Sequence, residues 1–430
     1  MQAPWPLWQR LLFRFFFIYL ALSMAPWTWL DRAFPWMNTV TQPYYSLMDW
    51  AVETSNALLF RVKDKLVPVG GSGDTSYGWA QLWFVLTISF VGMLIWSVLQ
   101  RRKKEYRKLN YWLCLFTRYY VAMVLFSYGI IKLFALQMPF PNYSQLATPL
   151  GDFLPMRFSW MFIGYSTPYQ VFSGFMEVFA GLLLLYRRTV TLGALVATGV
   201  FVNVAAMNLA YDIPVKIYSM QLVFCCLFLL ANEMDRILCF FIYNRPANAC
   251  TVYQYPFKKR WSRITRIVLK TLFIGIAAGS VLWESIEWKK QSQTQMNNMP
   301  FEAGVYDVTH YAINNDTMPP LLTDTLRWQQ VIFDNSRSGS ISTSDTAFRR
   351  MYNRAYFTYK ADTVKHTFNI LKRMTDSLPI AALQYRFEDA NTIRFWGRRQ
   401  SDSLSFVLKR SLRHFQLAEK QFHWLSESNR

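Results

Sequence analysis

The sequence predicts an α-helical membrane bundle of about seven spans, followed by a C-terminal antiparallel β domain that forms a small barrel or a sandwich. Hydrophobic residues make up 53% of the chain and charged residues only 17%, below the share of about 25% that is usual in soluble domains. The apolar residues gather in seven blocks, each long enough or nearly so to cross a membrane. Beyond residue 286 the chain changes to short alternating runs. The blocks cover residues 10–25, 79–99, 111–136, 168–186, 189–211, 216–231 and 267–283.

The loops between the blocks alternate in charge. Six Lys and Arg residues lie within 101–110 and seven within 232–266, whereas residues 31–77 hold four basic and five acidic residues. Basic loops mark the cytoplasmic face. We therefore expect a multi-pass protein of the bacterial cytoplasmic (inner) membrane. Its N-terminus lies in the cytoplasm, Arg10 and Arg14 flank the first span on the inner side, and the C-terminal domain is periplasmic.

The net charge of +20 does not indicate nucleic acid, because most of it lies in the cytoplasmic loops. Residues 1–285 carry 26 Lys and Arg against 12 Asp and Glu, and residues 286–430 carry 20 against 14. This distribution is typical of contact with anionic lipid headgroups. The expected partners are the lipid bilayer and an envelope protein that binds the exported domain.

Residues 1–110 are expected to form two spans joined by an outer loop. Within that loop, residues 44–67 have a helical apolar face suited to the membrane interface. The breaker cluster GGSGDTSYG then turns the chain back, and Asp74 or Thr75 is the expected N-cap of the second span.

Residues 111–243 are expected to form a core of four helices. The fourth and fifth blocks are separated only by the basic turn at 186–188, so they pack as an antiparallel pair. The fifth and sixth blocks are joined outside by YDIPVK, where Pro214 breaks the helix. Residues 244–290 supply a basic cytoplasmic segment and the seventh span, and a polar linker over 291–300 leads outward.

Residues 291–430 are expected to form the exported, mostly β domain. Its apolar and polar residues alternate in short runs separated by Asn, Asp, Gly and Ser, which is typical of antiparallel hairpins. The sequence does not decide whether the interior is filled or holds a ligand. The runs are GVYDVTHYAI, LRWQQVIF, AYFTYKAD, HTFNIL, ALQYRF, NTIRFWGR and SLSFVLKR.

Histidine and cysteine limit the metal chemistry of the membrane part. All the histidines lie in the C-terminal domain, so the spans offer no imidazole for haem, copper or zinc, and we expect no metal site. None of the cysteines lies in the exported domain, which must fold without disulfides. These residues are His310, His366, His414 and His423, and Cys114, Cys225, Cys226, Cys239 and Cys250.

Polar groups inside apolar helices are the candidate site. A charge at mid-bilayer depth costs about 3 kcal/mol or more, so such groups are usually paired and often functional. Glu177 lies near the middle of the fourth span, and either Arg118 or Lys132 on the third span is its expected partner. A buried pair that only fixes helix register is an equally weighted alternative. The candidate ligand-binding residues are Arg118, Lys132, Glu177, Asn203, Asn208, Asp212 and Lys216.

Two motifs in this core resemble the DoxX family of four-helix membrane proteins. In RYYVAMVLFSYGIIKLF, Arg118, Gly129 and Lys132 match the pattern of the family's first helix; in GFMEVFAGLLLLYRRTVTLGAL, Glu177 and Gly181 match that of the second. The resemblance covers residues of about 111–243. The additional spans and the β domain resemble elongated DoxX-like proteins of Bacteroidota, which generally lack an assigned activity.

The resemblance implies an accessory subunit of an envelope redox process, with a quinone or another lipophile bound between the third and fourth helices. No catalytic residue is identified, and a quinone is the only cofactor suggested. The alternative is a non-enzymatic structural or assembly protein whose exported β domain binds a partner. Transport ranks last, because the sequence has no apparent inverted repeat or broken helix.

Overall fold

The computed structural model describes residues 4–29, 31, 34–68, 73–246, 259–321, 327–419 and 424. The chain divides into two compact units. The first comprises Met1–Met138 and Thr167–Ile286, and the second comprises Pro139–Ser166 and Glu287–Arg430. Each unit is described by itself.

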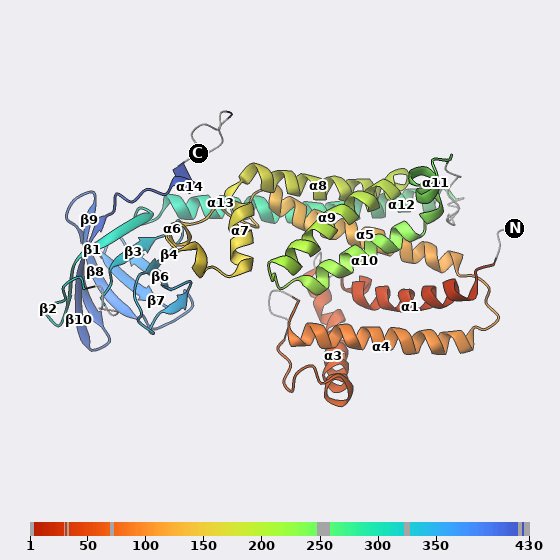
Figure 1. The fold of residues 1–430 in the computed structure, drawn as a ribbon, viewed down its shortest axis with the longest axis horizontal. Coiled ribbons are helices and arrows are strands. Elements are labelled where there is room, and N and C mark those ends of the chain that lie inside the picture. The colour runs from red at the N-terminus through yellow and green to blue at the C-terminus, as the bar shows by residue number, and fades with distance from the viewer. Residues whose placement is uncertain are drawn as a thin grey trace. The chain divides into compact units, whose positions relative to one another are not determined.

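The first unit is a bundle of helices (Figure 1). Its α-helices are α1 (Leu7–Met24), α3 (Asn38–Ser55), α4 (Ser76–Leu99), α5 (Arg107–Leu133), α8 (Thr167–Leu185), α9 (Val190–Ala210), α10 (Lys216–Ala231), α11 (Met234–Phe241) and α12 (Arg260–Ile274). Helix α13 (Ser280–Asn297) begins in this unit and continues past Ile286 into the second. Short 3₁₀ turns lie at Pro26–Thr28, Pro35–Met37 and Arg187–Thr189, and π-helical turns lie at Asn56–Phe60 and Gly275–Gly279.

Six helical segments of the described chain are long and apolar enough to cross a membrane. They coincide with six of the seven predicted blocks, and the other block forms the shorter apolar helix Lys216–Ala231. The prediction of a helical membrane part is confirmed, although the span count of seven is not. The helical segment that contains the predicted block at 267–283 is longer than that block and runs from Arg260 to Asn297. Residues 291–297 are therefore helical and not an irregular linker.

Buried contacts hold α1 against α4, and the two run side by side in Figure 1. Arg14 of α1, placed by the sequence at the inner end of the first span, is only 2% exposed. Its guanidinium donates to Tyr106 Oη (2.9 Å) and to Ser97 Oγ (2.7 Å). The ring of Phe13 stacks on Tyr106 at 5.2 Å between centroids. One buried cation thereby ties α1 to α4 and to the start of α5.

The second unit contains the predicted antiparallel sheet, closed into a barrel. Strands β2 and β5 are short additions, and the other eight follow the order β10-β9-β8-β7-β6-β4-β3-β1, with β1 pairing back to β10. A closed sheet leaves no exposed edge in these eight strands. Their bounds are β1 Gly304–Ile313, β2 Asp316–Thr317, β3 Gln330–Phe333, β4 Ser338–Ile341, β5 Arg349–Met351, β6 Arg354–Asp362, β7 Thr367–Leu371, β8 Ala381–Phe387, β9 Thr392–Arg399 and β10 Asp402–Arg410.

Aromatic side chains fill the barrel interior. The ring of Phe301, just before β1, lies 4.9–6.2 Å between centroids from six other rings. Phe301 is 1% exposed. Close-packed rings leave no room for a ligand at this level of the barrel. Five of these rings are buried, those of Phe333, Tyr359, Phe368, Tyr385 and Phe395, and the sixth, Phe387, is 47% exposed.

The connection between α5 and α8 packs on the barrel wall and belongs to the second unit. It contains α6 (Tyr143–Leu146), a 3₁₀ turn (Leu150–Asp152) and α7 (Pro155–Tyr165). Ala147 packs against Val305 and Ile332. We call residues 139–166 the strap. From the sequence alone this segment falls within the expected four-helix core over 111–243, because nothing in its local pattern indicates a partner more than 150 residues away.

We expect Phe301→Ala to lower the stability of the barrel by about 3–5 kcal/mol, because it removes a ring from a filled interior. Hydrogen exchange of the barrel strands in the full-length protein measures this. Leu378→Ala, at a side chain that is 82% exposed, is the control and should change stability by less than about 0.5 kcal/mol. Equal exchange rates in the two variants would contradict a filled interior.

Candidate functional site

Lys132 and Glu177 form a buried ion pair between α5 and α8. The ammonium of Lys132 contacts Glu177 Oε1, and the two side chains are only 9% and 3% exposed. The second carboxylate oxygen, Oε2, is buried and has no hydrogen-bond partner among the described residues. The structure thus selects Lys132 over Arg118 as the partner of Glu177.

Two glycines bring the helix backbones into contact beside this pair. A Cβ atom on Gly174 would lie 2.6 Å from the carbonyl oxygen of Gly129, and one on Gly129 would lie 2.9 Å from that of Gly174. Real Cβ atoms essentially never approach other atoms below 3.0 Å, so only glycine fits here. The ion pair therefore lies where α5 and α8 touch, with no space for a ligand between their backbones.

Two other predicted site residues lie away from this pair. The guanidinium of Arg118 lies 5.0 Å from the ring centroid of Tyr119, and no ion pair joins it to Glu177 in the described chain. Asn203 is on the exposed face of α9. Neither side chain takes part in the Lys132–Glu177 contact.

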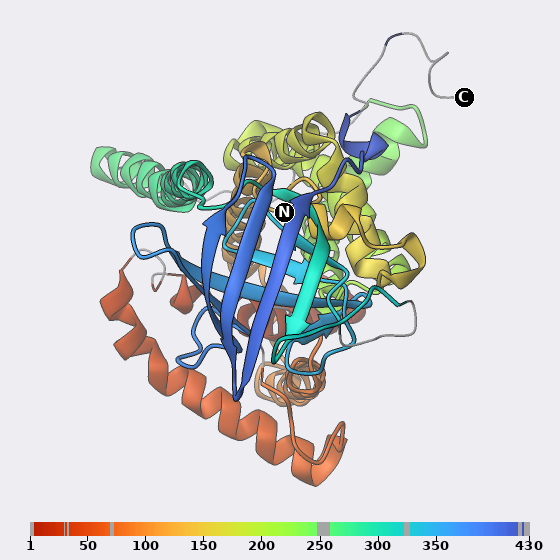
Figure 2. The ribbon, with the colours of Figure 1, turned by 90° about the vertical axis from the view of Figure 1, so that its left-hand side faces the viewer.

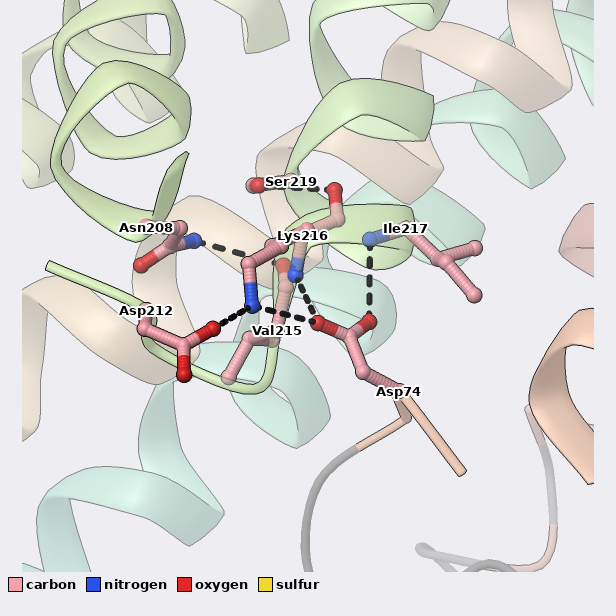
Figure 3. Close-up of polar contacts among 7 residues, drawn as sticks. All are labelled: Asp74, Asn208, Asp212, Val215, Lys216, Ile217 and Ser219. Carbon is pink, nitrogen blue, oxygen red and sulfur yellow. Dashed lines mark hydrogen bonds and ion pairs between the residues drawn. The ribbon is translucent and has the colours of Figure 1, made fainter. Parts of the chain in front are cut away.

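The other three predicted residues gather at the turn between α9 and α10, with Asp74 (Figure 3). Lys216 Nζ lies 2.6 Å from Asp212 Oδ1 and 3.9 Å from Asp74 Oδ2. Asn208 Nδ2 donates to the carbonyl oxygen of Val215 at 3.2 Å. Asp212 and Lys216 both belong to the YDIPVK turn of the sequence, and the structure brings them into contact.

Asp74 caps a different helix from the one expected from the sequence. Thr75 caps α4, with its side chain accepting from the backbone N–H of Gly78 at 3.2 Å. Asp74 instead caps α10: its carboxylate accepts from the backbone N–H of Lys216 (2.7 Å) and of Ile217 (3.1 Å), as Figure 3 shows. A carboxylate is favourable at a helix N-terminus. This cap joins the N-terminal helices to the predicted four-helix core.

Gln170 of α8 binds the backbone of Met138, the residue just before the strap begins. Its amide nitrogen donates to the carbonyl oxygen of Met138 (2.7 Å), and its amide oxygen accepts from the backbone N–H of Met138 (3.1 Å). The side chain is fully buried. A glutamine in an apolar helix is the sequence signal that would have pointed to it.

A buried polar cluster fixes the strap to the barrel. Asp334, 2% exposed, accepts from the backbone N–H of Ser144 (2.9 Å) and from its hydroxyl (2.8 Å). The hydroxyl of Ser340 lies 2.8 Å from that of Ser144 and accepts from Arg354 Nε at 2.8 Å. Burial raises the pKa of Asp334 to about 6, although both hydrogen bonds from Ser144 and the charge of Arg354 oppose that rise.

The described histidines and cysteines do not gather into a metal site. Within the described ranges, no group of three or more His, Cys, Asp or Glu could hold a metal ion. His414 Nδ1 lies 2.9 Å from Glu419 Oε1, and His310 Nε2 lies 3.5 Å from Thr317 Oγ1. His423 and Cys250 lie outside the described residues.

Comparison with known proteins gives one relative without an assigned activity. A stretch of 121 residues is 35% identical to YwoB, an uncharacterized protein of Bacillus subtilis (strain 168), and the match covers 28% of this chain and 74% of that protein. No protein-family model and no solved structure matches the chain.

We expect the second unit to lose stability as pH rises through about 6. Burial raises the pKa of Asp334 from 3.8, the value of an exposed carboxyl, to about 6, so folding of this unit takes up a proton. Its contribution to stability is full below about pH 4 and is lost above pH 6, a change of up to about 3 kcal/mol. Hydrogen exchange of residues 139–166 between pH 4.5 and 7.5 measures it.

Asp334→Asn should remove this pH dependence, since the amide does not titrate in that range. Asp316→Asn, which removes an equal charge at an exposed position on β2, should retain it. The interpretation is wrong if wild type and Asp334→Asn show the same slope of exchange against pH.

Proposed function

The chain belongs to the same family as Bacillus subtilis YwoB, and we propose that it is a non-enzymatic structural or assembly protein of the bacterial envelope. The Lys132–Glu177 pair carries this proposal. It lies beside the Gly129–Gly174 contact, so it fills the interface that a lipophile would need. A buried pair in such a place sets which helix faces meet.

The barrel supports the same proposal. Its interior is filled by the rings around Phe301, so recognition is left to its outer surface. The role we propose for this domain is binding an envelope partner, while the helical bundle anchors it to the membrane.

We propose that the bundle crosses the membrane seven times. The additional span is Lys216–Ala231, which at 16 residues is slightly short for a bilayer of about 30 Å. The positions of the basic loops support a seventh span, because residues 101–110, 187–188 and 232–266 then all lie on the cytoplasmic side. The barrel is periplasmic in this arrangement. Residues 111–243 would be the DoxX-like core.

One observation favours a second candidate function, an accessory role in an envelope redox process with a bound quinone. Glu177 Oε2 is buried without a hydrogen-bond partner among the described residues, and a buried acceptor left unsatisfied costs free energy. The hydroxyl of a reduced quinone (a quinol) that reached α8 could donate a hydrogen bond to this oxygen. Glu177 would then anchor the ligand or carry its proton.

Glu177→Gln tests the two candidates against each other. Removing one member of a buried pair leaves the other charge unpaired and costs about 3–5 kcal/mol. The structural role therefore predicts a lower melting temperature or misassembly, with no separate functional defect. The redox role predicts that Glu177→Gln, once inserted, also lacks activity and the lipophile that co-purifies with the wild type. Thermal melting in detergent, together with co-purified lipophiles identified by mass spectrometry, distinguishes them.

The double variant Lys132→Met/Glu177→Met is the matched control. Replacing both charges by apolar side chains of similar volume should restore most of the stability lost in Glu177→Gln. A structural pair predicts that assembly recovers with stability. Recovery of stability without recovery of function would contradict the proposal and favour the bound lipophile.

The proposed orientation is tested by single cysteines in a cysteine-free background. In spheroplasts, a membrane-impermeant maleimide should label Asp389→Cys in the barrel turn and should not label Lys104→Cys in the basic loop until the membrane is permeabilised. The reverse pattern would overturn the orientation, because it would place the cation-rich loops outside.

A further inference from the structure

Strands β8, β9 and β10 present a polar outer face in which one tryptophan lies between two arginines of its own strand. Residues of β9 that alternate with the buried Ile393 and Phe395 point outward: Arg394, Trp396 and Arg398. We call this surface the Trp396 face. Figure 2 shows the long blue strands that carry it, beside the blue-green β1.

The strand register sets the neighbours of these residues. Arg386 of β8 lies directly opposite Arg394, and Gln384 lies opposite Trp396. On the other side, Ser405 of β10 lies opposite Trp396. The tryptophan is thus bordered across the strands by short or flexible polar side chains and along its own strand by two arginines. Its ring remains 38% exposed.

Acidic side chains do not neutralise all the arginines of this face. Like charges directly opposite on neighbouring strands destabilise a sheet, yet Arg386 and Arg394 are such a pair. Glu388 pairs with Arg394 at 2.5 Å, while Arg386 and Arg398 have no ion pair among the described residues. Cations held together in this way favour an anionic ligand.

A shallow hollow of about 490 Å³ lies beside the tryptophan, lined by Arg386, Glu388, Arg394 and Trp396. It combines guanidinium groups, which bind carboxylate or phosphate in bidentate geometry, with a flat apolar ring. The carboxylate of Glu388 accepts hydrogen bonds only. A ligand that suits all of them carries both negative charges and hydroxyl groups.

The spacing of the cations distinguishes a polymer from a small ion. Arg394 and Arg398 are four residues apart on β9, which corresponds to roughly 13 Å along a strand. Trp396 lies between them on the strand, so a ligand that stacks on its ring meets a cation on either side. We propose that the Trp396 face binds an acidic polysaccharide of the cell envelope, whose sugar rings stack on Trp396 while successive negative groups pair with Arg386 and Arg398.

This inference rests on the proposed function, because it names the partner class that the barrel would bind. It does not depend on the Lys132–Glu177 pair. The two proposals therefore fail separately: a Glu177→Gln variant that binds polysaccharide normally but lacks a specific activity overturns only the structural role of the bundle.

The experiment uses the full-length protein in neutral phosphatidylcholine nanodiscs, titrated with fluorescent alginate oligosaccharides. We expect saturable binding that weakens with salt, and at least a tenfold loss of affinity in Arg386→Gln/Arg398→Gln and in Trp396→Ala. Arg349→Gln, an exposed arginine on β5, is the control and should leave affinity within twofold.

Three further probes decide the class of ligand. Neutral dextran oligosaccharides should not bind, and single-stranded oligo-dT and phosphatidylglycerol vesicles should bind with at least tenfold lower affinity than alginate. The proposal is overturned if no probe binds, if dextran binds as alginate does, or if DNA or vesicles bind more tightly through the same residues. Unchanged alginate binding in Trp396→Ala and Arg386→Gln/Arg398→Gln would overturn it as well, provided that both variants keep the melting temperature of the wild type.

Discussion

The buried contact between Lys132 and Glu177 is the constraint on which the arrangement of the bundle depends. Two charges in an apolar helix interface are tolerated only as a pair, so α5 and α8 must meet at the level of these residues. Gly129 and Gly174 allow the helix backbones to come that close. With these faces fixed, Gln170 on α8 reaches Met138 just beyond α5 and closes the base of the strap.

The same principle explains the other connections between distant parts of the chain. Asp74 satisfies the free N–H groups at the start of α10, and Asp334 binds Ser144 of the strap. In both cases a carboxylate accepts backbone N–H groups that would otherwise lose their hydrogen bonds with water. Asp334 differs in being almost fully buried, which raises its pKa to about 6.

Because the barrel interior is filled, the binding surface of this domain is sought on its outside. A closed antiparallel barrel can enclose a ligand, but here the rings around Phe301 occupy that space. The interior therefore supplies stability, and the outward residues of the same strands are free to differ in charge. On β9 this division is visible residue by residue, because buried Phe395 lies between exposed Arg394 and Trp396.

The sequence by itself determined the elements whose cause is local. Apolar length identified the helices, and alternation identified β1 over residues 304–313 as well as β8 to β10. It missed β4, Ser338–Ile341, because SGSI has neither alternation nor β-branched residues before Ile341. It also identified Glu177 as a buried charge that needs a partner, and left Arg118 and Lys132 as alternatives. Only the tertiary structure decided between them, closed the sheet into a barrel, and placed the strap on its wall. Those choices depend on which surfaces meet across 45 residues for Lys132 and Glu177 and across 190 residues for Ser144 and Asp334, and no local pattern encodes that.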